Sequence, residues 1–421
     1  MKGKLDMNRN LTPTTFATRN LACSAMRRHV LRACLALALG SLLPVAHATQ
    51  KPPVLVGLDA EFGHTTSTSA QAVRQGMEIA IDEINQAGGV LGGRKLELVV
   101  RDNRSIPAIA VDNLKDLAAM PDLVGVFGAK FSPVLVEWLK PAHELGLPIF
   151  ATWSSADQIT DPAYQPGYSF RLSLKDEWAG PVFLRFAADR YAARKVGLLL
   201  PNTAWGRSNK AAIAKASGPA GVKVVAERWY NWGDQSLIES YQDLRAAGAQ
   251  AVILVANEVE GAILVKEMAA LPAAQRLPII SHWGVTGGRF AEMTGAALDQ
   301  VDLSVIQTFS FIGARSPAAR RVLAALKSRY GMPSAERIIS PVGIAHAYDL
   351  THLLARAINQ AKSTDRARIR DALERLGPYD GLVRRYSRPF TATRHDALGP
   401  EQIFMARFTA DDRLIPIAWR R

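Results

Sequence analysis

Residues 123–158 read LVGVFGAKFSPVLVEWLKPAHELGLPIFATWSSADQ, and this stretch decides the fold. Its first five residues are apolar and have the length and composition of a buried strand. A short turn at 128–131 leads to Ser132 and Pro133, which are typical of an N-cap and of a first helical residue. The apolar spacing that follows predicts a helix. The predicted order is therefore strand, turn, helix.

A second strand of the same kind follows this helix. The Gly-Leu-Pro sequence at 146–148 ends the helix, and residues 149–152 predict a strand. The sequence SADQ at 155–158 fits a capping box that opens another helix. Two parallel strands are therefore expected to end beside each other in loops rich in hydroxyl groups.

Loops at such strand ends suit a small anionic ligand. Backbone N–H groups at a helix start are unpaired and carry the positive end of the helix dipole, so the loop ending at Ser132 can hold a carboxylate. Open α/β sheets bind ligands at the carboxyl ends of their strands. The alternative is that Ser132 and Ser155 only cap their own helices, as such residues do in many α/β proteins.

The first 48 residues have the three parts of a secretory signal. Residues 27–32 are basic, residues 33–45 are mostly apolar, and Ala-His-Ala at 46–48 is a small-x-small cleavage site. The apolar part is too short to span a bilayer. Both cysteines, Cys23 and Cys34, lie in this leader, so the mature chain is expected to have no disulfide. General secretory and twin-arginine export both remain open, as does Met26 as the true start.

The mature chain is long enough for two domains and is moderately basic. The leader carries seven Lys or Arg and one Asp, so about +7 of the net charge of +13 belongs to the rest of the chain. These charges are scattered among acidic residues, with a modest basic cluster at 384–388. A solvated surface is therefore a better interpretation than a nucleic-acid track.

Strands alternate with helices along the mature chain. Strands are expected at 54–58, 96–100, 196–200, 222–226, 251–255 and 277–280. This alternation predicts βαβ units and parallel sheets, and its restart after residue 172 predicts a second sheet. A further helix is expected from Ser340, and short antiparallel strands are expected at 404–408 and 414–418.

With these elements in order, the chain resembles the periplasmic leucine/isoleucine/valine-binding proteins. These are the type I solute-binding receptors of branched-chain amino acid and amide ABC transporters. The resemblance covers nearly the whole mature chain. It rests on GMEIAIDEIN at 76–85 followed by Gly88-Gly89, on the Gly-x-x-x-Ser loop at 128–132, on Tyr348-Asp349, and on the turn at 377–381.

The resemblance implies an α/β fold in which two doubly wound parallel-sheet lobes are joined by three hinge strands. By analogy, lobe 1 combines residues 51–173 with 307–380, and lobe 2 combines 174–306 with 381–421. A ligand between the lobes would stabilise the closed form by the difference between its affinities for the closed and open states. The implied partner is an ABC permease of the inner membrane. No cofactor is implied, and a monomer is expected.

The resemblance also implies ligand contacts. In the family, the serine after the glycine-rich turn and the loop at the next strand end hold the ligand carboxylate, and these positions are here Ser132, Thr152 and Ser154. An aromatic residue before a glycine in the opposite lobe packs over the ligand, and Trp205 matches it. The alternative for Trp205 is an aromatic residue on the lobe surface.

The second lobe departs from the family pattern at Trp283. Amino-acid binders usually place an acidic residue there against the ligand ammonium, and an ammonium buried without a carboxylate costs several kcal/mol. A standard aliphatic α-amino acid is therefore in doubt. Asn257, Glu258 and Glu260, on the neighbouring strand-end loop, are candidates for supplying the missing charge, although a solvated helix start explains them equally well.

Three aromatic residues, Phe62, Phe131 and Trp153, are further candidates for the walls of the site. Each is of a kind found more often in a core or at a rim than against a ligand. The expected ligand is a small carboxylate or amide with an aromatic or apolar body.

Other function classes find little support in the sequence. It lacks the Gly-x-Ser-x-Gly, His-Glu-x-x-His and Gly-x-x-x-x-Gly-Lys motifs, and the mature chain has no cysteine, so neither an enzyme nor a metal site is expected. The export signal argues against a nucleic-acid binder. A receptor for a membrane sensor kinase is the alternative to a transport receptor, because the same closing body serves either role.

Overall fold

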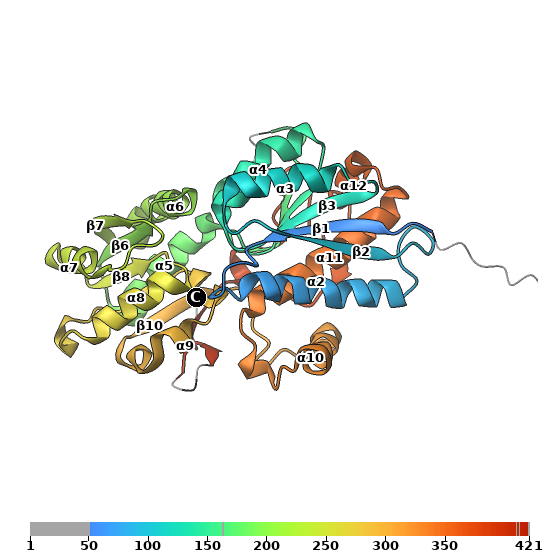
Figure 1. Ribbon diagram of the computed structural model, residues 1–421. Coiled ribbons are helices and arrows are strands. Elements are labelled where there is room, and N and C mark those ends of the chain that lie inside the picture. The colour runs from blue at the N-terminus through green and yellow to red at the C-terminus, as the bar shows by residue number, and fades with distance from the viewer. Residues whose placement is uncertain (1–50, 162–163, 410, 412, 420–421) are drawn as a thin grey trace, which may run out of the picture. The chain divides into compact units, whose positions relative to one another are not determined.

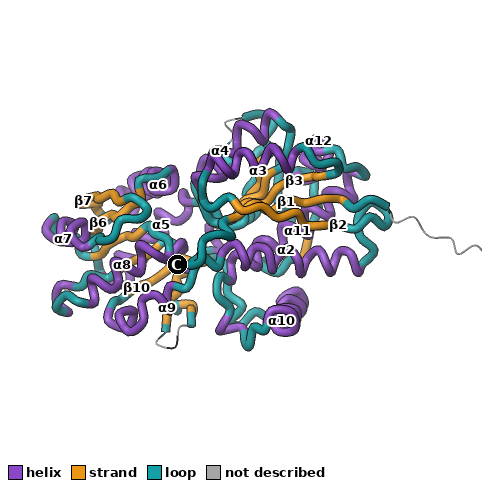
Figure 2. Tube along the Cα trace, in the orientation of Figure 1, coloured by secondary structure: helices purple, strands orange, loops and turns teal. Residues whose placement is uncertain are grey.

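The computed structural model describes residues 51–161, 164–409, 411 and 413–419 (Figure 1). The expected signal segment at 1–48, with both cysteines, lies outside the described residues. Within the described part, the strands form two separate groups that are each flanked by helices (Figure 2). These two groups are the lobes.

The first lobe is built on a parallel sheet with the strand order β2-β1-β3-β4-β5. All six residues of the central strand β3 are buried, as expected for a parallel strand covered on both faces. One core lies between the sheet and helices α2, α11 and α12, and a second core lies under α3 and α4. The bounds are β1 Val54–Ala60, β2 Leu96–Asp102, β3 Leu123–Gly128, β4 Ile149–Ala151, β5 Ser169–Arg171, α2 Ser69–Gln86, α3 Pro107–Ala118, α4 Ser132–Glu144, α11 Pro341–Ala361 and α12 Arg366–Leu373.

The second lobe is built on a mixed sheet with the order β14-β13-β10-β9-β8-β6-β7. Strands β6 to β10 are parallel, and β13 and β14 add an antiparallel edge, as the sequence predicts for the C-terminal residues. The bounds are β6 Lys195–Pro201, β7 Lys223–Tyr230, β8 Ala251–Leu254, β9 Ile279–Ser281, β10 Leu303–Gln307, β13 Phe404–Phe408, β14 Leu414–Pro416, α5 Asp176–Tyr191, α6 Ala204–Ala220, α7 Ile238–Ala246, α8 Glu258–Ala269 and α9 Phe290–Thr294. Helix α10 (Pro317–Tyr330) follows β10 and packs against α2 of the first lobe.

The described chain passes between the two sheets three times, after β5, after β10 and before β13. The fold class predicted from the sequence is therefore confirmed: the chain has two doubly wound α/β lobes joined by three crossings. A small hairpin of β11 (Tyr379–Asp380) and β12 (Arg385–Tyr386) follows α12.

The predicted assignment of residues 381–398 to lobe 2 differs from the structure. Arg171 of β5 forms a parallel bridge with Asp396, and the Phe390 ring lies 5.0 Å from the Phe170 ring. Tyr386 also belongs to the core of the first lobe. The third crossing therefore comes later than predicted, because residues of irregular structure pair with the edge of the first sheet before the chain reaches β13.

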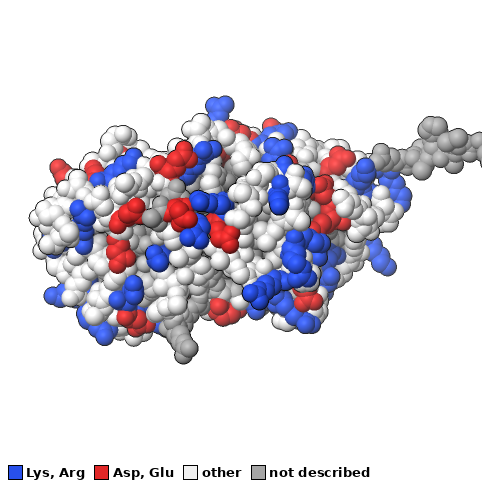
Figure 3. All heavy atoms as spheres, turned by 90° about the horizontal axis from the view of Figure 1, so that it is seen from below, with Lys and Arg blue, Asp and Glu red and all other residues white. Residues whose placement is uncertain are grey.

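Basic and acidic side chains are interspersed on the face in Figure 3, in agreement with the scattered charge of the sequence. Among the described residues, no helix combines the length and the apolar character that a membrane crossing requires.

Helices α2 and α11 lie side by side in the first lobe (Figure 1) and approach each other closely at Gly76. A Cβ atom on Gly76 would overlap the backbone carbonyl of Ile344. Backbone cannot move aside as a flexible side chain can, so only glycine fits at this contact. The glycine of the GMEIAIDEIN motif is thus explained by helix packing.

We expect the substitution Gly76→Ala to lower the free energy of unfolding by about 2 kcal/mol, because the two helices must separate. Urea unfolding should show a lower midpoint with an unchanged slope. The control Gln71→Ala, at an exposed position of the same helix, should leave the midpoint unchanged. A native midpoint for Gly76→Ala would contradict the packing argument.

Candidate functional site

The predicted site residues lie on loops and helix starts at the carboxyl ends of strands in both sheets. Those of the first lobe follow β3 and β4, and those of the second lobe follow β6, β8 and β9. All eight are buried: Phe131, Ser132, Thr152, Trp153, Ser154, Trp205, Asn257 and Trp283. The structure therefore places the two sets of loops where ligands bind in open α/β sheets.

Hydroxyl groups tie the first two loops together. Thr152 Oγ1 donates to the Gly128 carbonyl at 2.7 Å, and Ser154 Oγ donates to the Ala129 carbonyl at 2.7 Å. The backbone N–H groups of the same two residues donate to the same carbonyls, at 3.3 and 3.1 Å. The loop after β4 is thus fixed against the loop after β3.

Ser132 completes this link between the loops and does not act as the predicted N-cap. Helix α4 begins at Ser132, and the N-cap position falls on Phe131 without a side-chain cap. Ser132 Oγ instead accepts hydrogen bonds from the backbone N–H groups of Ser155 and Ala156, at 3.2 and 3.3 Å. The reading in which Ser132 only caps its own helix is therefore wrong.

The predicted helix after Ser155 is also absent from the structure. Only a short 3₁₀ turn, η1 at Asp157–Ile159, forms there, and no side chain caps it. The backbone N–H of Asp157 donates to Ser208 Oγ of α6 in the second lobe, at 3.0 Å. The polar residues of this segment therefore serve contacts between the lobes rather than a helix start.

Three tryptophan side chains meet at the junction of the lobes. The Trp153 and Trp283 rings lie 5.8 Å apart. The Trp205 ring packs against Gly284 so closely that a Cβ atom on Gly284 would lie 2.7 Å from that ring. The indole nitrogens of Trp153 and Trp205 are buried and have no hydrogen-bond partner among the described residues. A buried donor without a partner costs about 1–3 kcal/mol, so these two N–H groups call for an acceptor.

A buried His282–Asp176 pair lies beside Trp205. The His282 ring is 4.9 Å from the Trp205 ring, and its Nε2 is 3.0 Å from Asp176 Oδ1. His282 Nδ1 accepts a hydrogen bond from the Trp283 backbone N–H at 2.9 Å, so the ring proton is on Nε2 and the imidazole is neutral. The other carboxylate oxygen, Asp176 Oδ2, has no partner among the described residues.

The acidic residues near Asn257 do not form a solvated helix start, because Glu258 is 2% exposed and Glu260 is 5% exposed. Glu258 Oε2 pairs with Lys130 Nζ of the first lobe at 2.6 Å, and both side chains are almost fully buried. Burial raises the pKa of Glu260, which accepts a hydrogen bond from the Gly233 N–H at 3.3 Å. The candidate charge of Glu258 is therefore already paired within the protein.

Phe131 belongs to the contact between the lobes. Its ring meets the Trp232 ring of the second lobe edge-on at 5.2 Å, and Lys130 Nζ lies 5.0 Å from the Phe131 ring centre. Phe62 packs at the edge of the first-lobe core and remains partly exposed.

Arg171 links the loop after β4 to the last crossing of the chain. Its guanidinium is fully buried and donates to the carbonyls of Ser155 and Ala156, at 3.2 and 2.8 Å. The same group pairs with Asp396 at 2.6 Å. The nearby charge of Arg171 holds the pKa of Asp396 below its ordinary value, against the opposing effect of burial.

His346 on α11 is hydrogen-bonded to the loop after β4. Its Nδ1 is 2.8 Å from the Thr152 carbonyl and therefore carries the proton, and its Nε2 accepts from Thr308 Oγ1 at 3.0 Å. The side chain is fully buried, and burial lowers the pKa of His346 to about 4. His346 is thus a neutral positioning residue under the loop.

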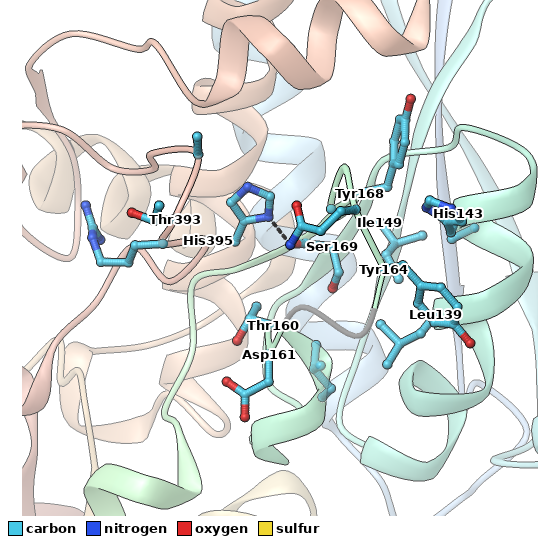
Figure 4. A pocket seen from close by; sticks show the side chains of 16 residues that line it. Leu139, His143, Ile149, Thr160, Asp161, Tyr164, Tyr168, Ser169, Thr393 and His395 are labelled. Atoms are coloured by element: carbon cyan, nitrogen blue, oxygen red, sulfur yellow. Dashed lines mark hydrogen bonds between the residues drawn. The ribbon is translucent and has the colours of Figure 1, made fainter.

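The cavity in Figure 4 lies elsewhere, at the edge strand of the first sheet. It has a volume of about 370 Å³ and is lined by residues of α4, of the segment 159–169 and of 392–395. His395 Nδ1 donates to the Ser169 carbonyl at 2.8 Å at its margin. None of the predicted site residues lines this cavity.

Sequence reasoning missed Lys130, Asp176, Arg171 and His346 as members of this region. Lys130 stands two positions before Ser132, so its place in the glycine-rich turn was a usable signal. The other three come from the first residue of α5, from the edge strand β5 and from the distant helix α11. Their place at the site follows from tertiary structure, for which the sequence offers no spacing pattern.

A protein-family model described as periplasmic binding protein matches residues 55–412. The chain belongs to this family. The predicted resemblance to leucine/isoleucine/valine-binding proteins is confirmed by curated relatives of this binding protein. One is the leucine-, isoleucine-, valine-, threonine-, and alanine-binding protein of Pseudomonas aeruginosa, 26% identical over 306 residues, which cover 71% of this chain and 76% of the relative.

Solved structures show the same fold as this binding protein. A periplasmic binding protein type 1 from Bordetella pertussis Tohama I matches with a TM-score of 0.77 and 21% identity over 87% of this chain and 100% of that chain. An ABC-transporter solute binding protein from R. palustris, in complex with benzoate, matches with a TM-score of 0.72 and 17% identity, over 87% and 95% of the two chains. The family is a non-enzymatic, ligand-binding class of the periplasm.

The neutral state of His346 predicts a specific dependence of this binding protein's stability on pH. Below pH 6.5 the unfolded chain binds a proton that the folded protein accepts only near pH 4, so stability is lost as the pH falls through this window. Between pH 7.5 and 5.0, the native chain should lose about 2 kcal/mol more unfolding free energy than His346→Gln. Equal losses in the two proteins would show that the imidazole charges in the folded state.

Proposed function

We propose that this binding protein captures a small, amino-acid-like carboxylate or amide between its lobes and delivers it to the permease of an ABC transporter. One observation carries the proposal: the loops of both lobes meet around buried indole N–H groups that have no acceptor in the part of the chain that the structure describes. A ligand oxygen would satisfy these donors, and it would contact both lobes at once. Contact with both lobes is the condition for stabilising a closed state.

The ligands named for similar proteins support a carboxylate. The P. aeruginosa relative is named for five amino acids, and the R. palustris structure contains benzoate. These ligands share a carboxylate on a small body, which is apolar or aromatic in each of them except threonine. The three tryptophans at the junction of the lobes suit such a body.

Transport is favoured over sensing for one reason. The R. palustris protein is described as part of an ABC transporter, and its fold covers most of this chain. We propose that the protein is exported to the periplasm and that the signal at 1–48 is cleaved near Ala48. We also propose that the mature protein acts as a monomer. Native mass spectrometry of protein purified from its own periplasm tests the proposal, because a receptor should carry a small molecule.

The indole nitrogen of Trp205 gives a direct test of the site. The substitution Trp205→Phe keeps an aromatic ring but removes the unpaired donor together with part of the indole. We expect ligand affinity to fall about tenfold. The unliganded protein should lose stability only through the smaller ring, since the N–H has no partner among the described residues. Isothermal titration with the co-purified ligand measures the first effect, and thermal unfolding measures the second. Unchanged affinity would remove Trp205 Nε1 from the site.

Ser132→Ala tests the hydroxyl link between the two loops. Its loss leaves the N–H groups of Ser155 and Ala156 without their acceptor. We expect ligand binding to weaken by about 1–3 kcal/mol, because the loop that faces the ligand loses its fixed position. Ser217→Ala is the matched control, because Ser217 is half-buried and its hydroxyl donates to the Ala214 carbonyl of its own helix, α6. Native affinity in Ser132→Ala would show that the link is not needed for binding.

A further inference from the structure

Among the described residues, the carboxylate of Asp176 has no cationic partner. Its side chain is fully buried, and its one partner, His282, is held neutral by the Trp283 backbone N–H. The second oxygen, Oδ2, is unpaired among the described residues. A buried carboxylate without a cation is strongly unfavourable, so a cation from outside the chain would stabilise Asp176.

Asp176 is not explained as a helix cap. It is the first residue of α5, and the N-cap residue of that helix, Lys175, makes no side-chain cap hydrogen bond. The nearby Asp157 does bind the helix start, since its Oδ1 accepts from the Glu177 N–H at 2.9 Å. Asp157 is therefore the acidic residue that accepts a hydrogen bond from this helix start. Asp176 Oδ2 accepts none there among the described residues.

Charges of both signs lie around Asp176, and none of the cations among the described residues is bonded to it. Burial, and next the charge of Asp176, raise the pKa of Asp157 to about 6. The two cations that act on Asp157, Lys175 and Arg171, are paired elsewhere: Lys175 with Asp161 at 2.9 Å, and Arg171 with Asp396 at 2.6 Å. Neither forms an ion pair with Asp176.

A second unpaired acceptor lies level with Asp176. Helices α5 and α6 touch where Gly180 meets Ala212, and Asp176 and Asn209 each precede that contact by about one helical turn. Asn209 Nδ2 donates to the Trp205 carbonyl at 3.1 Å, whereas its Oδ1 is buried without a partner among the described residues. An ammonium has three N–H donors and suits two such oxygens.

Both acceptors border the first lobe. The Asp157 N–H donates to Ser208 Oγ, next to Asn209, and Asp157 Oδ1 accepts from Glu177, next to Asp176. Asp157 comes from the loop after β4, which carries Trp153. The unpaired oxygens therefore lie at the same junction of the lobes as the candidate ligand site.

We propose that Asp176 is the acceptor for a cationic nitrogen of the ligand, with Asn209 beside it. Asp176 then supplies the carboxylate that amino-acid binders usually carry at the position of Trp283. Neither Glu258 nor Glu260 takes this role. The inference rests on the proposed receptor function and specifies the chemistry of its ligand. The same contact makes Asp176 a specificity residue: it favours an amine-bearing carboxylate over the corresponding acid without nitrogen.

The binding test compares leucine and phenylalanine with 4-methylpentanoate and 3-phenylpropanoate, together with any molecule that co-purifies. In the native chain, the amine-bearing partner of a pair should bind roughly 10- to 150-fold more tightly, the range of one hydrogen bond to a charged group. Asp176→Asn should abolish this preference. Glu260→Gln should retain it, because the proposal gives that carboxylate no ligand contact.

A second measurement needs no ligand. Thermal unfolding of the unliganded protein should show a higher Tm for Asp176→Asn, which removes an uncompensated buried charge, and a lower Tm for Glu258→Gln, which leaves Lys130 unpaired. A lower Tm for Asp176→Asn would overturn the inference, since it would mean that the carboxylate is already balanced within the fold.

The outcomes separate this inference from the receptor role. Equal binding of the two members of a pair, or a preference that survives in Asp176→Asn, overturns the assignment of Asp176 and leaves the receptor standing. A protein that binds no member of the panel and carries no co-purified molecule overturns the receptor role, and this inference falls with it.

Discussion

The site depends on the hydrogen bonds that join the loop after β3 to the loop after β4. The hydroxyl groups of Thr152 and Ser154 donate to carbonyls of the loop after β3, and the hydroxyl of Ser132 accepts from the backbone of the loop after β4. Neighbouring parallel strands bring their carboxyl ends together, but they do not fix the loops that follow. Here the loops are fixed by short polar side chains, which is why a run of serine and threonine stands where a ligand site needs rigidity.

The buried charges of the junction fall into two kinds. Lys130 and Glu258 form a complete pair across the lobes, and Arg171 and Asp396 form another within the first lobe. Each pair satisfies itself and holds parts of the fold in place. Asp176 differs, because its histidine partner is neutral and one of its oxygens is unpaired. Completed pairs thus organise the protein, whereas the incomplete pair is the one left for an outside molecule.

The sequence predicts the framework because that framework is specified locally. The apolar run at β3, the turn after it and the helix α4 follow each other as their residue types predict, and so do the antiparallel strands at the C-terminus. The failures are tertiary. Ser132 has the composition of a cap, yet its oxygen faces another loop, and residues 381–398 carry no periodicity that would assign them to either sheet. Likewise, Lys130 and Glu258 pair across 128 positions of the chain, and no local pattern encodes that distance.

The guanidinium of Arg171 links a distant part of the chain to the site. It joins carbonyls of the loop after β4 to Asp396, which is 225 residues away in the sequence and lies on the approach to the third crossing. Substitutions near Asp396 should therefore be classed with those of the ligand loop and not with those of a C-terminal tail. When natural variants of this receptor are compared, changes at these two places should be read together.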